Sequence, residues 1–240
     1  MPVITVVSPS HNNQFCSTWG NYHFKTFDGD LFRLPSTCSY IFASQCKADY
    51  NSFNIELQRQ ESDEVTTINK VTMKLDGEVV ELANGSIKIN NEPAEIPFSR
   101  GGISVESIAS YVKVQAKLGL VLMWNQEDSL WVELDAKFRN QTCGLCGDFN
   151  ELNNEFTNSD TGASYSIDEY GDKWKISGLS DNCETTSFQA KESCEVPEDL
   201  CQKLQTESAF DSCQGLIDTE SFINACKEDL CSCDSNDTSC

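Results

Sequence analysis

The distribution of cysteines constrains this chain more than any other feature. The 240 residues include 13 cysteines, but the 96 residues between Cys46 and Cys143 include none, whereas the last 47 residues include seven. A segment dense in cysteine is held together by crosslinks, and a long segment without cysteine depends on a hydrophobic core. The sequence therefore predicts two parts of different construction.

Cysteine use also indicates the cellular compartment. Disulfides persist in oxidising surroundings, and the sequence lacks the paired Cys and His spacing of zinc sites. We therefore expect a secreted protein. The cysteines expected to form disulfides are Cys16, Cys38, Cys46, Cys143, Cys146, Cys183, Cys194, Cys201, Cys213, Cys226, Cys231 and Cys233. Cys240 makes the number odd and no signal peptide is visible, so we expect a fragment of a longer protein.

Three glycosylation sequons agree with secretion. They begin at Asn84, Asn140 and Asn236, and N-glycans are added only in the secretory pathway. No stretch approaches the roughly 18 apolar residues that a transmembrane helix needs. The sequence therefore predicts no insertion into a membrane.

The charge of the chain excludes one class of partner. The net charge is −21, and binding to phosphate backbones needs the opposite sign, so we expect no nucleic acid partner. Residues 143–240 carry 5 basic and 21 acidic side chains, against 12 and 17 in residues 1–142. Acidity concentrated in this way favours divalent cations, although ordinary solubility is the alternative explanation.

Alternating hydrophobicity predicts an antiparallel, mainly β domain over residues 14–184, after a polar lead-in at 1–13. A sandwich or a flattened barrel fits this pattern. A hairpin is expected around Asp28-Gly29, with a two-residue turn. Further strands are expected at 38–43, 53–58, 65–75, 78–82, 86–89, 103–105, 111–116, 118–124 and 130–134. Residues 157–182 are interpreted as an acidic loop anchored by one cluster, Tyr170 to Trp174, with Cys183 closing the β domain.

The run 118–124 is apolar at every alternating position except Gly119, so we expect a central strand covered on both faces. Trp124 and Trp131 are expected in the core. After a linker at 185–193 the period changes, and residues 194–240 show apolar spacing typical of two short helices beginning near Pro197 and Asp218. This tail is predicted to be a small helical module crosslinked by disulfides.

The segment from Cys143 to Glu155 combines a Cys-x-x-Cys pair with oxygen-bearing side chains. A redox dithiol or a zinc site would use the cysteines, and Ca²⁺ would use the oxygens. An EF-hand does not fit, because a loop counted from Asp148 has Asn153 at the required glycine and Ser159 at the required glutamate. The remaining alternative is an Asn/Asp-rich turn whose side chains bond their own backbone.

Several motifs in order resemble one known family. They are Cys16-Ser17-Thr18-Trp19-Gly20, Phe27-Asp28-Gly29-Asp30, Leu122-Met123-Trp124-Asn125 and Cys143-Gly144-Leu145-Cys146-Gly147-Asp148-Phe149-Asn150. They resemble the von Willebrand factor type D domain, and their residues are most similar to those of the first D assembly of the secreted gel-forming mucins. The tail from Cys194 resembles a truncated C8 module, with seven cysteines in place of eight.

The resemblance implies a calcium site and two disulfide pairings. The implied ligands are Asp28, Asp148, Asn150, Leu152 through its carbonyl, and Asn154 or Glu155. Glu151 stands where many members have Gly. The implied pairings join Cys16 to Cys146 and Cys38 to Cys183. Other D assemblies of the same protein are the implied partners, in a disulfide-linked polymer.

Three functions compete at this point. The first is a structural module of a secreted mucin that contributes to calcium-dependent polymer assembly. The second is thiol–disulfide exchange, which would need a free thiolate of low pKa at Cys143 or Cys146; we expect both to be oxidised and the protein not to be an enzyme. The third is a ligand-binding extracellular protein outside the mucins. The sequence shows no Ser/His/Asp signature of a hydrolase, and His11 and His23 are its only histidines.

Overall fold

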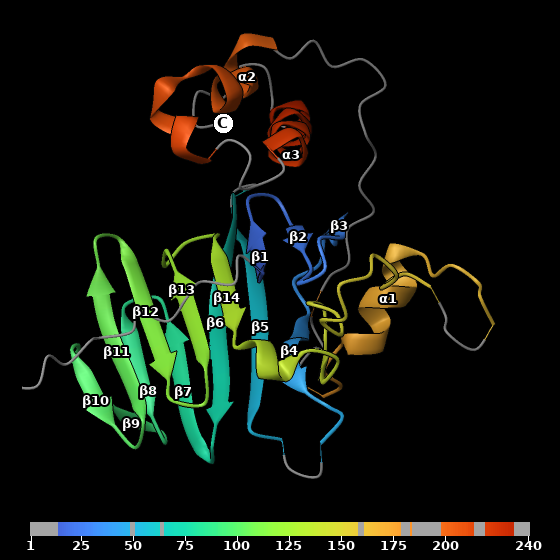
Figure 1. Cartoon of the computed structure of the whole chain (residues 1–240). Coiled ribbons are helices and arrows are strands. Elements are labelled where there is room, and N and C mark those ends of the chain that lie inside the picture. The colour runs from blue at the N-terminus through green and yellow to red at the C-terminus, as the bar shows by residue number, and fades with distance from the viewer. Residues whose placement is uncertain are drawn as a thin grey trace, which may run out of the picture.

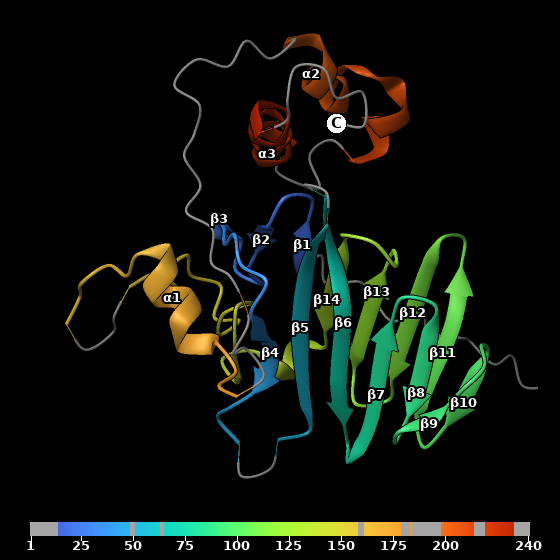
Figure 2. The same ribbon diagram turned by 180° about the vertical axis from the view of Figure 1, so that it is seen from behind.

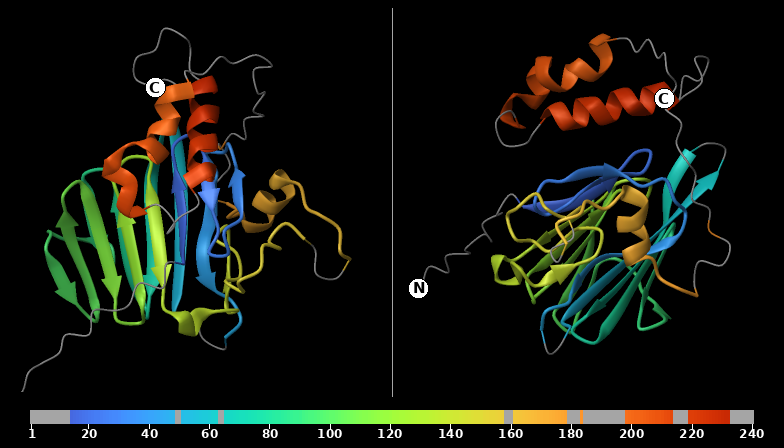
Figure 3. Two further views of the ribbon diagram at one scale, coloured as in Figure 1. Left: turned by 45° about the horizontal axis from the view of Figure 1, so that its top comes forward. Right: turned by 90° about the vertical axis from the view of Figure 1, so that its right-hand side faces the viewer.

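The computed structural model describes residues 14–48, 51–62, 65–157, 161–178, 183, 198–213 and 219–232. Two antiparallel sheets face each other over residues 15–143, and helices lie beside them (Figures 1 and 2). This arrangement confirms the predicted mainly β fold. It is a sandwich with two separate sheets, as the view along the layers shows (Figure 3, right).

The first sheet has eight strands in the order β10-β11-β12-β13-β14-β1-β2-β3. Its strands are β1 (Phe15–Trp19), β2 (His23–Lys25), β3 (Leu31–Arg33), β10 (Phe98–Arg100), β11 (Ile103–Ile108), β12 (Tyr111–Ala116), β13 (Leu120–Trp124) and β14 (Leu130–Leu134).

The second sheet has seven strands in the order β15-β4-β5-β6-β7-β8-β9. Its strands are β4 (Ser39–Gln45), β5 (Phe53–Ser62), β6 (Val65–Leu75), β7 (Glu78–Ala83), β8 (Ser86–Ile89), β9 (Glu92–Pro93) and β15 (Thr142–Cys143). The chain thus returns to this sheet at the segment around Cys143, after completing the first sheet.

The core lies between the sheets and follows from period-two alternation. Leu122 of β13 is paired with Val132 of β14, and Val71 of β6 with Leu82 of β7. All four side chains are fully buried. Because successive side chains on a strand point to opposite faces, each such pair places one apolar row inside the sandwich.

Two predictions about the core need correction. β13 is central in its sheet, but Val121 and Met123 are only half-buried, so its second face is not fully covered. Trp124 is buried, whereas Trp131, paired with Met123 across β13 and β14, lies half-buried on the outer face beside Phe15. Phe15 and Met123 give this outer face enough apolar cover to hold a Trp outside the core.

The hairpin at Asp28 is formed by β2 and β3, but its turn is longer than two residues. The N–H of Thr26 donates to the carbonyl of Asp30 at 2.9 Å, so the turn spans residues 26–30. The two residues before the Asp28-Gly29 pair and the one after it carry Asp28 out toward the loop that follows Cys146. That displacement matters for the site below.

The prediction of a loop over residues 157–182 is wrong in part. Helix α1 (Ile167–Trp174) begins at Ser166, whose hydroxyl accepts the N–H of Glu169, while the carboxylate of Glu169 accepts the N–H of Ser166. This is a capping box, and the Ser-x-x-Glu spacing that forms it is visible in the sequence. The helix buries Tyr170 against the β domain.

The helical tail contains α2 (Glu198–Thr206), the 3₁₀ helix η2 (Ser208–Cys213) and α3 (Thr219–Ser232). A disulfide between Cys201 and Cys226 joins α2 to α3, around a small core that includes Ile223. We call residues 198–232 the helical module. It lies beyond the end of the sandwich where β1 meets β2 (Figures 1 and 3). In the described parts of the chain, no helix is long and apolar enough to cross a bilayer.

Candidate metal centre

The segment that follows β15 connects the two sheets. Cys146 forms a disulfide with Cys16 of β1, in the first sheet. Cys143 forms one with Cys46, directly after β4, in the second sheet. The N–H of Leu145 donates to the carbonyl of Ile41 in β4 at 3.0 Å. The segment 143–150, which we call the cysteine node, is therefore fixed to both layers at once.

The two cysteines of the Cys-x-x-Cys pair are oxidised, each with a different and distant partner. The separations along the chain are 130 residues for Cys16–Cys146 and 97 for Cys46–Cys143. A redox dithiol needs its two thiols free or bonded to each other, and neither condition holds here. The structure also joins Cys38 to Cys183, so both pairings implied by the resemblance are present.

Helix α1 holds the cysteine node from the outside. The hydroxyl of Tyr170 donates to the carbonyls of Gly144 and Leu145 at 3.1 and 3.4 Å. Its ring packs edge-on against Phe32 and Phe156. Burial raises the pKa of Tyr170 far above its ordinary value, so the hydroxyl stays a donor at every physiological pH.

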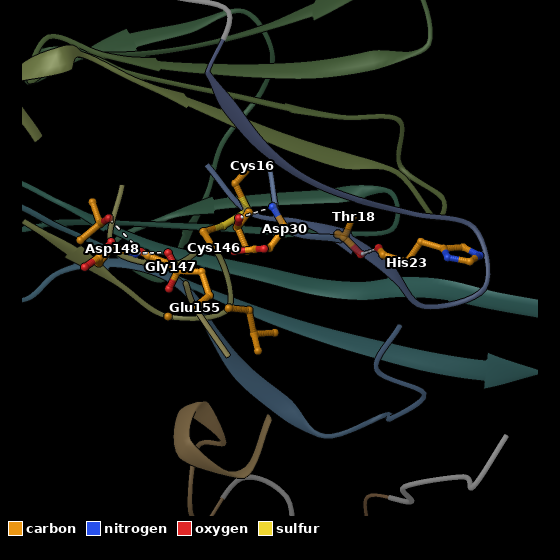
Figure 4. The surroundings of a disulfide bond; sticks show 12 residues. Cys16, Thr18, His23, Asp30, Cys146, Gly147, Asp148 and Glu155 are labelled. Carbon is orange, nitrogen blue, oxygen red and sulfur yellow. Dashed lines mark hydrogen bonds between the residues drawn. A yellow bond between two sulfur atoms is a disulfide. The ribbon is translucent and has the colours of Figure 1, made fainter. Parts of the chain in front are cut away.

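Three carboxylates meet beside the node. Oxygens of Asp28, Asp148 and Glu155 lie within 4.8 Å of one another, and each side chain is half-buried. Asp28 comes from the β2–β3 hairpin, and the other two come from the node and the loop after it. Figure 4 shows Asp148 and Glu155 gathered with Gly147 and Asp30 around the Cys16–Cys146 disulfide.

Clustering of these acids makes one of them hard to ionise. Burial, together with the charges of Asp148 and Asp28, raises the pKa of Glu155 to about 8, although the backbone N–H of Asp148 opposes the change. Burial and the charge of Asp28 likewise raise the pKa of Asp30. Like charges in a partly desolvated site cost free energy unless a proton or a cation offsets them.

Two oxygens of the site have no hydrogen-bond partner among the described residues. They are Oδ1 of Asp148 and Oδ2 of Asp30, and both are buried. A buried carboxylate oxygen without a donor is costly, and a cation satisfies it. Ca²⁺ takes six to eight oxygen ligands from carboxylates, amides and carbonyls. The donor set therefore fits a hard divalent cation.

The other predicted ligands form a turn next to the carboxylates. The side-chain oxygen of Asn150 accepts the N–H of Leu152 at 2.7 Å, and its amide group donates to the side-chain oxygen of Asn154 at 3.2 Å. The carbonyl of Leu152 accepts the N–H of Asn154. The Asn/Asp-rich turn, predicted as the alternative to a cation site, is thus present. It lies next to the three carboxylates, so the two features occur together.

Glu151, at the position where many family members have Gly, adopts a φ of +68°. Such a left-handed conformation favours glycine. The side chain of Glu151 forms an ion pair with Arg139 at 2.8 Å, and its N–H donates to Asp28. These two contacts hold the strained residue in place.

Gly147 leaves room for the acid that completes the cluster. A Cβ at this position would lie 2.2 Å from Oε1 of Glu155, and φ here is +82°. The same oxygen accepts the N–H of Asp148 at 3.1 Å. Any side chain at residue 147 would therefore push Glu155 out of the site.

The remaining predicted residues are not part of the acidic cluster. Asn84 is exposed on the turn between β7 and β8. Asn140 is exposed just before β15, and its N–H donates to the carbonyl of Phe149 in the cysteine node. Cys201 is bonded to Cys226, and Cys231 is also disulfide-bonded. Cys213 ends η2. Asn236, Cys194, Cys233 and Cys240 lie outside the described residues.

Sequence reasoning missed the role of Asp30, which is two residues beyond Asp28 on the same hairpin; that spacing was a usable signal. Tyr170 was expected to anchor a loop. Its contact with the cysteine node was not predicted, and only the Ser-x-x-Glu capping signal indicated the helix that carries it.

Comparison with known proteins agrees with this architecture. Residues 16–162 match the model of the von Willebrand factor type D domain, and residues 200–240 match that of the C8 domain. Mucin-5AC of Homo sapiens is 41% identical over 239 residues, which is 99% of this chain and 4% of that protein. Mucin-5B of Homo sapiens is 40% identical over 97% of this chain and 4% of its own length.

A more distant relative also matches nearly the whole chain. Otogelin-like protein of Homo sapiens is 27% identical over 94% of this chain and 10% of its own length. The chain thus spans a small part of the relatives it matches. It is a mucin-like type D module. With more than half of its residues matched by one domain model, the chain belongs to the von Willebrand factor type D domain family.

Proposed function

We propose that this chain is a structural module of a secreted, mucin-like protein and contributes to calcium-dependent, disulfide-linked polymer assembly with other D assemblies. One observation carries the proposal: two disulfides and three clustered carboxylates meet at the node that connects the sheets. The similarity to mucins over nearly the whole chain supports it.

The residues that would hold Ca²⁺ are Asp28, Asp148 and Glu155, with Asp30 beside them. Asn150, the carbonyl of Leu152 and Asn154 offer further oxygens from the adjacent turn. The cation would offset the repulsion that now raises the pKa of Glu155. The protein's own contribution is to bring a hairpin of one sheet and a loop from the node to the same point.

A rigid, crosslinked module of this kind suits a polymer rather than catalysis. Cys143 and Cys146 are both engaged in long-range disulfides, so neither offers the thiolate that exchange chemistry needs. We therefore propose that the protein is not an enzyme. Within the secretory pathway, the exposed Asn84 and Asn140 are the described positions open to N-glycosylation.

The test of the cation site is a calcium titration followed by thermal melting. The wild-type chain should gain in Tm with added Ca²⁺, since a ligand that binds only the folded state stabilises it by mass action. Asp148→Ala should abolish that gain. Asp76→Asn is the matched control, because Asp76 is exposed on the β6–β7 turn at a φ that Asn tolerates. An equal gain in Asp148→Ala would reject the site.

Assembly needs a separate measurement. Sedimentation of the purified chain with Ca²⁺ and with a chelator should show association only with Ca²⁺, and Asp148→Ala should stay dissociated in both. Association that is the same with and without Ca²⁺ would contradict the calcium dependence. A monomer under all conditions would contradict the assembly role of this module.

A further inference from the structure

The helical module contacts the β domain at the turn between β1 and β2. The ring centroid of Trp19, at the end of β1, lies 4.8 Å from that of Phe222 in α3, and Trp19 also stacks on His23 of β2 at 5.7 Å. Asp229 follows Phe222 by seven residues, which is two helical turns along the same face of α3. Its Oδ1 lies 2.7 Å from Nε2 of His23.

This turn is shaped to receive a carboxylate. The N–H of Asn21 donates to Oδ2 of Asp229 at 3.4 Å. A Cβ on Gly20 would lie 2.6 Å from the same oxygen, and Gly20 has a φ of +51°. Only glycine therefore lets the carboxylate reach both the backbone and the imidazole of the buried His23.

Charge complementarity supports the same contact. Burial lowers the pKa of Arg33 of β3 and of Arg59 of β5, and the negative charge of Asp229 opposes that shift in both. Arg59 is buried and donates to the hydroxyl of Thr18 and the carbonyl of Gly20, which fixes the turn from below. Within a chain of net charge −21, this corner of the β domain presents cationic groups to an acidic helix.

Acidic groups of the β domain at this corner are already engaged. Asp128, on the β13–β14 turn, accepts the N–H of Gly20 through Oδ2. Glu61 accepts the hydroxyl of Tyr22. These contacts order the turn, and the N–H of Asn21 and the imidazole of His23 face Asp229 of α3.

We infer that residues 19–23 form a receptor for the helical module, and that Asp229 is the anchor that fixes the module on the β domain. The partner that fits is a helix with an aromatic residue and, seven positions later, an acid. Docking also creates a groove of about 260 Å³ between the two parts, lined by Phe24 and Leu31 on one side and by Asn224 and Ala225 on the other. That groove exists only in the docked arrangement.

Hydrogen exchange on the full chain tests this inference. In Asp229→Ala, the amides of residues 20–23 and of α3 should exchange roughly tenfold faster than in the wild type, because charged hydrogen bonds of this kind hold the contact closed. Asp211→Ala is the control: it removes the same charge from the helical module, at an exposed position in η2 that does not line the groove. It should leave exchange at residues 20–23 unchanged.

The variants are expected to keep their fold, since Cys201–Cys226 joins α2 to α3 independently of the β domain. Unchanged circular dichroism verifies this. Unchanged exchange in Asp229→Ala, or an equal effect of Asp211→Ala, would overturn the inference.

A double-mutant cycle tests whether His23 is the residue that binds Asp229. His23→Gln should also speed exchange of α3, and adding Asp229→Ala to it should give less than the product of the two single effects, because both changes break the same contact. Effects that multiply fully would show that the two residues act separately, and would overturn the assignment of His23 as the receptor for Asp229.

Discussion

The Oδ2 atom of Asp28 accepts the backbone N–H of Asn150 at 3.0 Å, although 122 positions separate the two residues. The other oxygen of Asp28 accepts the N–H of Glu151. A hairpin of the first sheet is thereby joined to the loop after the cysteine node without any metal. The same carboxylate belongs to the acidic cluster, so it serves the fold and the cation site together.

Asp28→Ala should therefore destabilise the chain even when no cation is present. Two N–H groups would lose a charged acceptor, at a cost of roughly 1–3 kcal/mol in the free energy of unfolding. Urea denaturation in a chelator measures this. Asp172→Ala, at an exposed site on α1, is the control and should change little. Equal stabilities of wild type and Asp28→Ala would show that these bonds contribute nothing.

Glu155 makes the stability of the metal-free chain depend on pH. Its pKa is raised to about 8 in the folded state by burial and by its acidic neighbours, above an ordinary value near 4.5. A raised pKa means that the folded state holds the proton more tightly, so the stabilisation is complete below about pH 4 and is lost as the pH rises through about 8.

Thermal melts in a chelator across this range should show Tm falling toward alkaline pH, whereas Glu155→Gln should flatten the curve. Saturating Ca²⁺ should also flatten it, since the cation offsets the negative charge. A metal-free wild-type chain whose Tm rises between pH 5 and pH 8 would contradict this account.

The hydroxyl of Tyr170 is expected to matter beyond its ring. Tyr170→Phe keeps the packing against Phe32 and Phe156 but removes the donor to the carbonyls of Gly144 and Leu145. The free energy of unfolding should fall by about 1–2 kcal/mol. Tyr111→Phe on β12, where the side chain is half-buried, is the matched control. A loss no larger than that of the control would mean that the node does not need this contact.

Thiol counting distinguishes a structural node from an exchange enzyme. Under denaturing, non-reducing conditions, alkylation and peptide mapping should find no free thiol at Cys143 or Cys146, because each is bonded to a distant cysteine. The fragments recovered should be the crosslinked pairs with Cys46 and Cys16. Two reactive thiols at positions 143 and 146 would instead favour thiol exchange.

Local patterns were enough to predict most of the sheet. The strands 65–75, 86–89, 111–116 and 130–134 were predicted from alternation and turn residues, with bounds that agree with the structure, and the hairpin at Asp28-Gly29 is present with a longer turn. Such features depend on neighbours in sequence. The prediction for Trp131 was wrong because alternation separates the two faces of a strand but does not show which face is buried when both carry apolar residues.

The acidic site was predictable in part and for a different reason. The residues 148–155 are close in sequence, and their oxygens suggested a cation. Asp28 was assigned from a family resemblance, because nothing local to the hairpin indicates which distant loop it meets. The role of Asp30 and the contact of Tyr170 with the node were not predicted, since they arise only where the hairpin, node and α1 come together.

Periodicity and composition over short spans are sufficient to predict the strands, the crosslinked character of the tail and the oxygen-rich loop. The approach of Asp28 to Asp148, and of Asp229 to His23 206 positions away, is a property of the folded chain. Contacts of this kind depend on how layers stack and how turns are aimed, and no local pattern encodes that geometry.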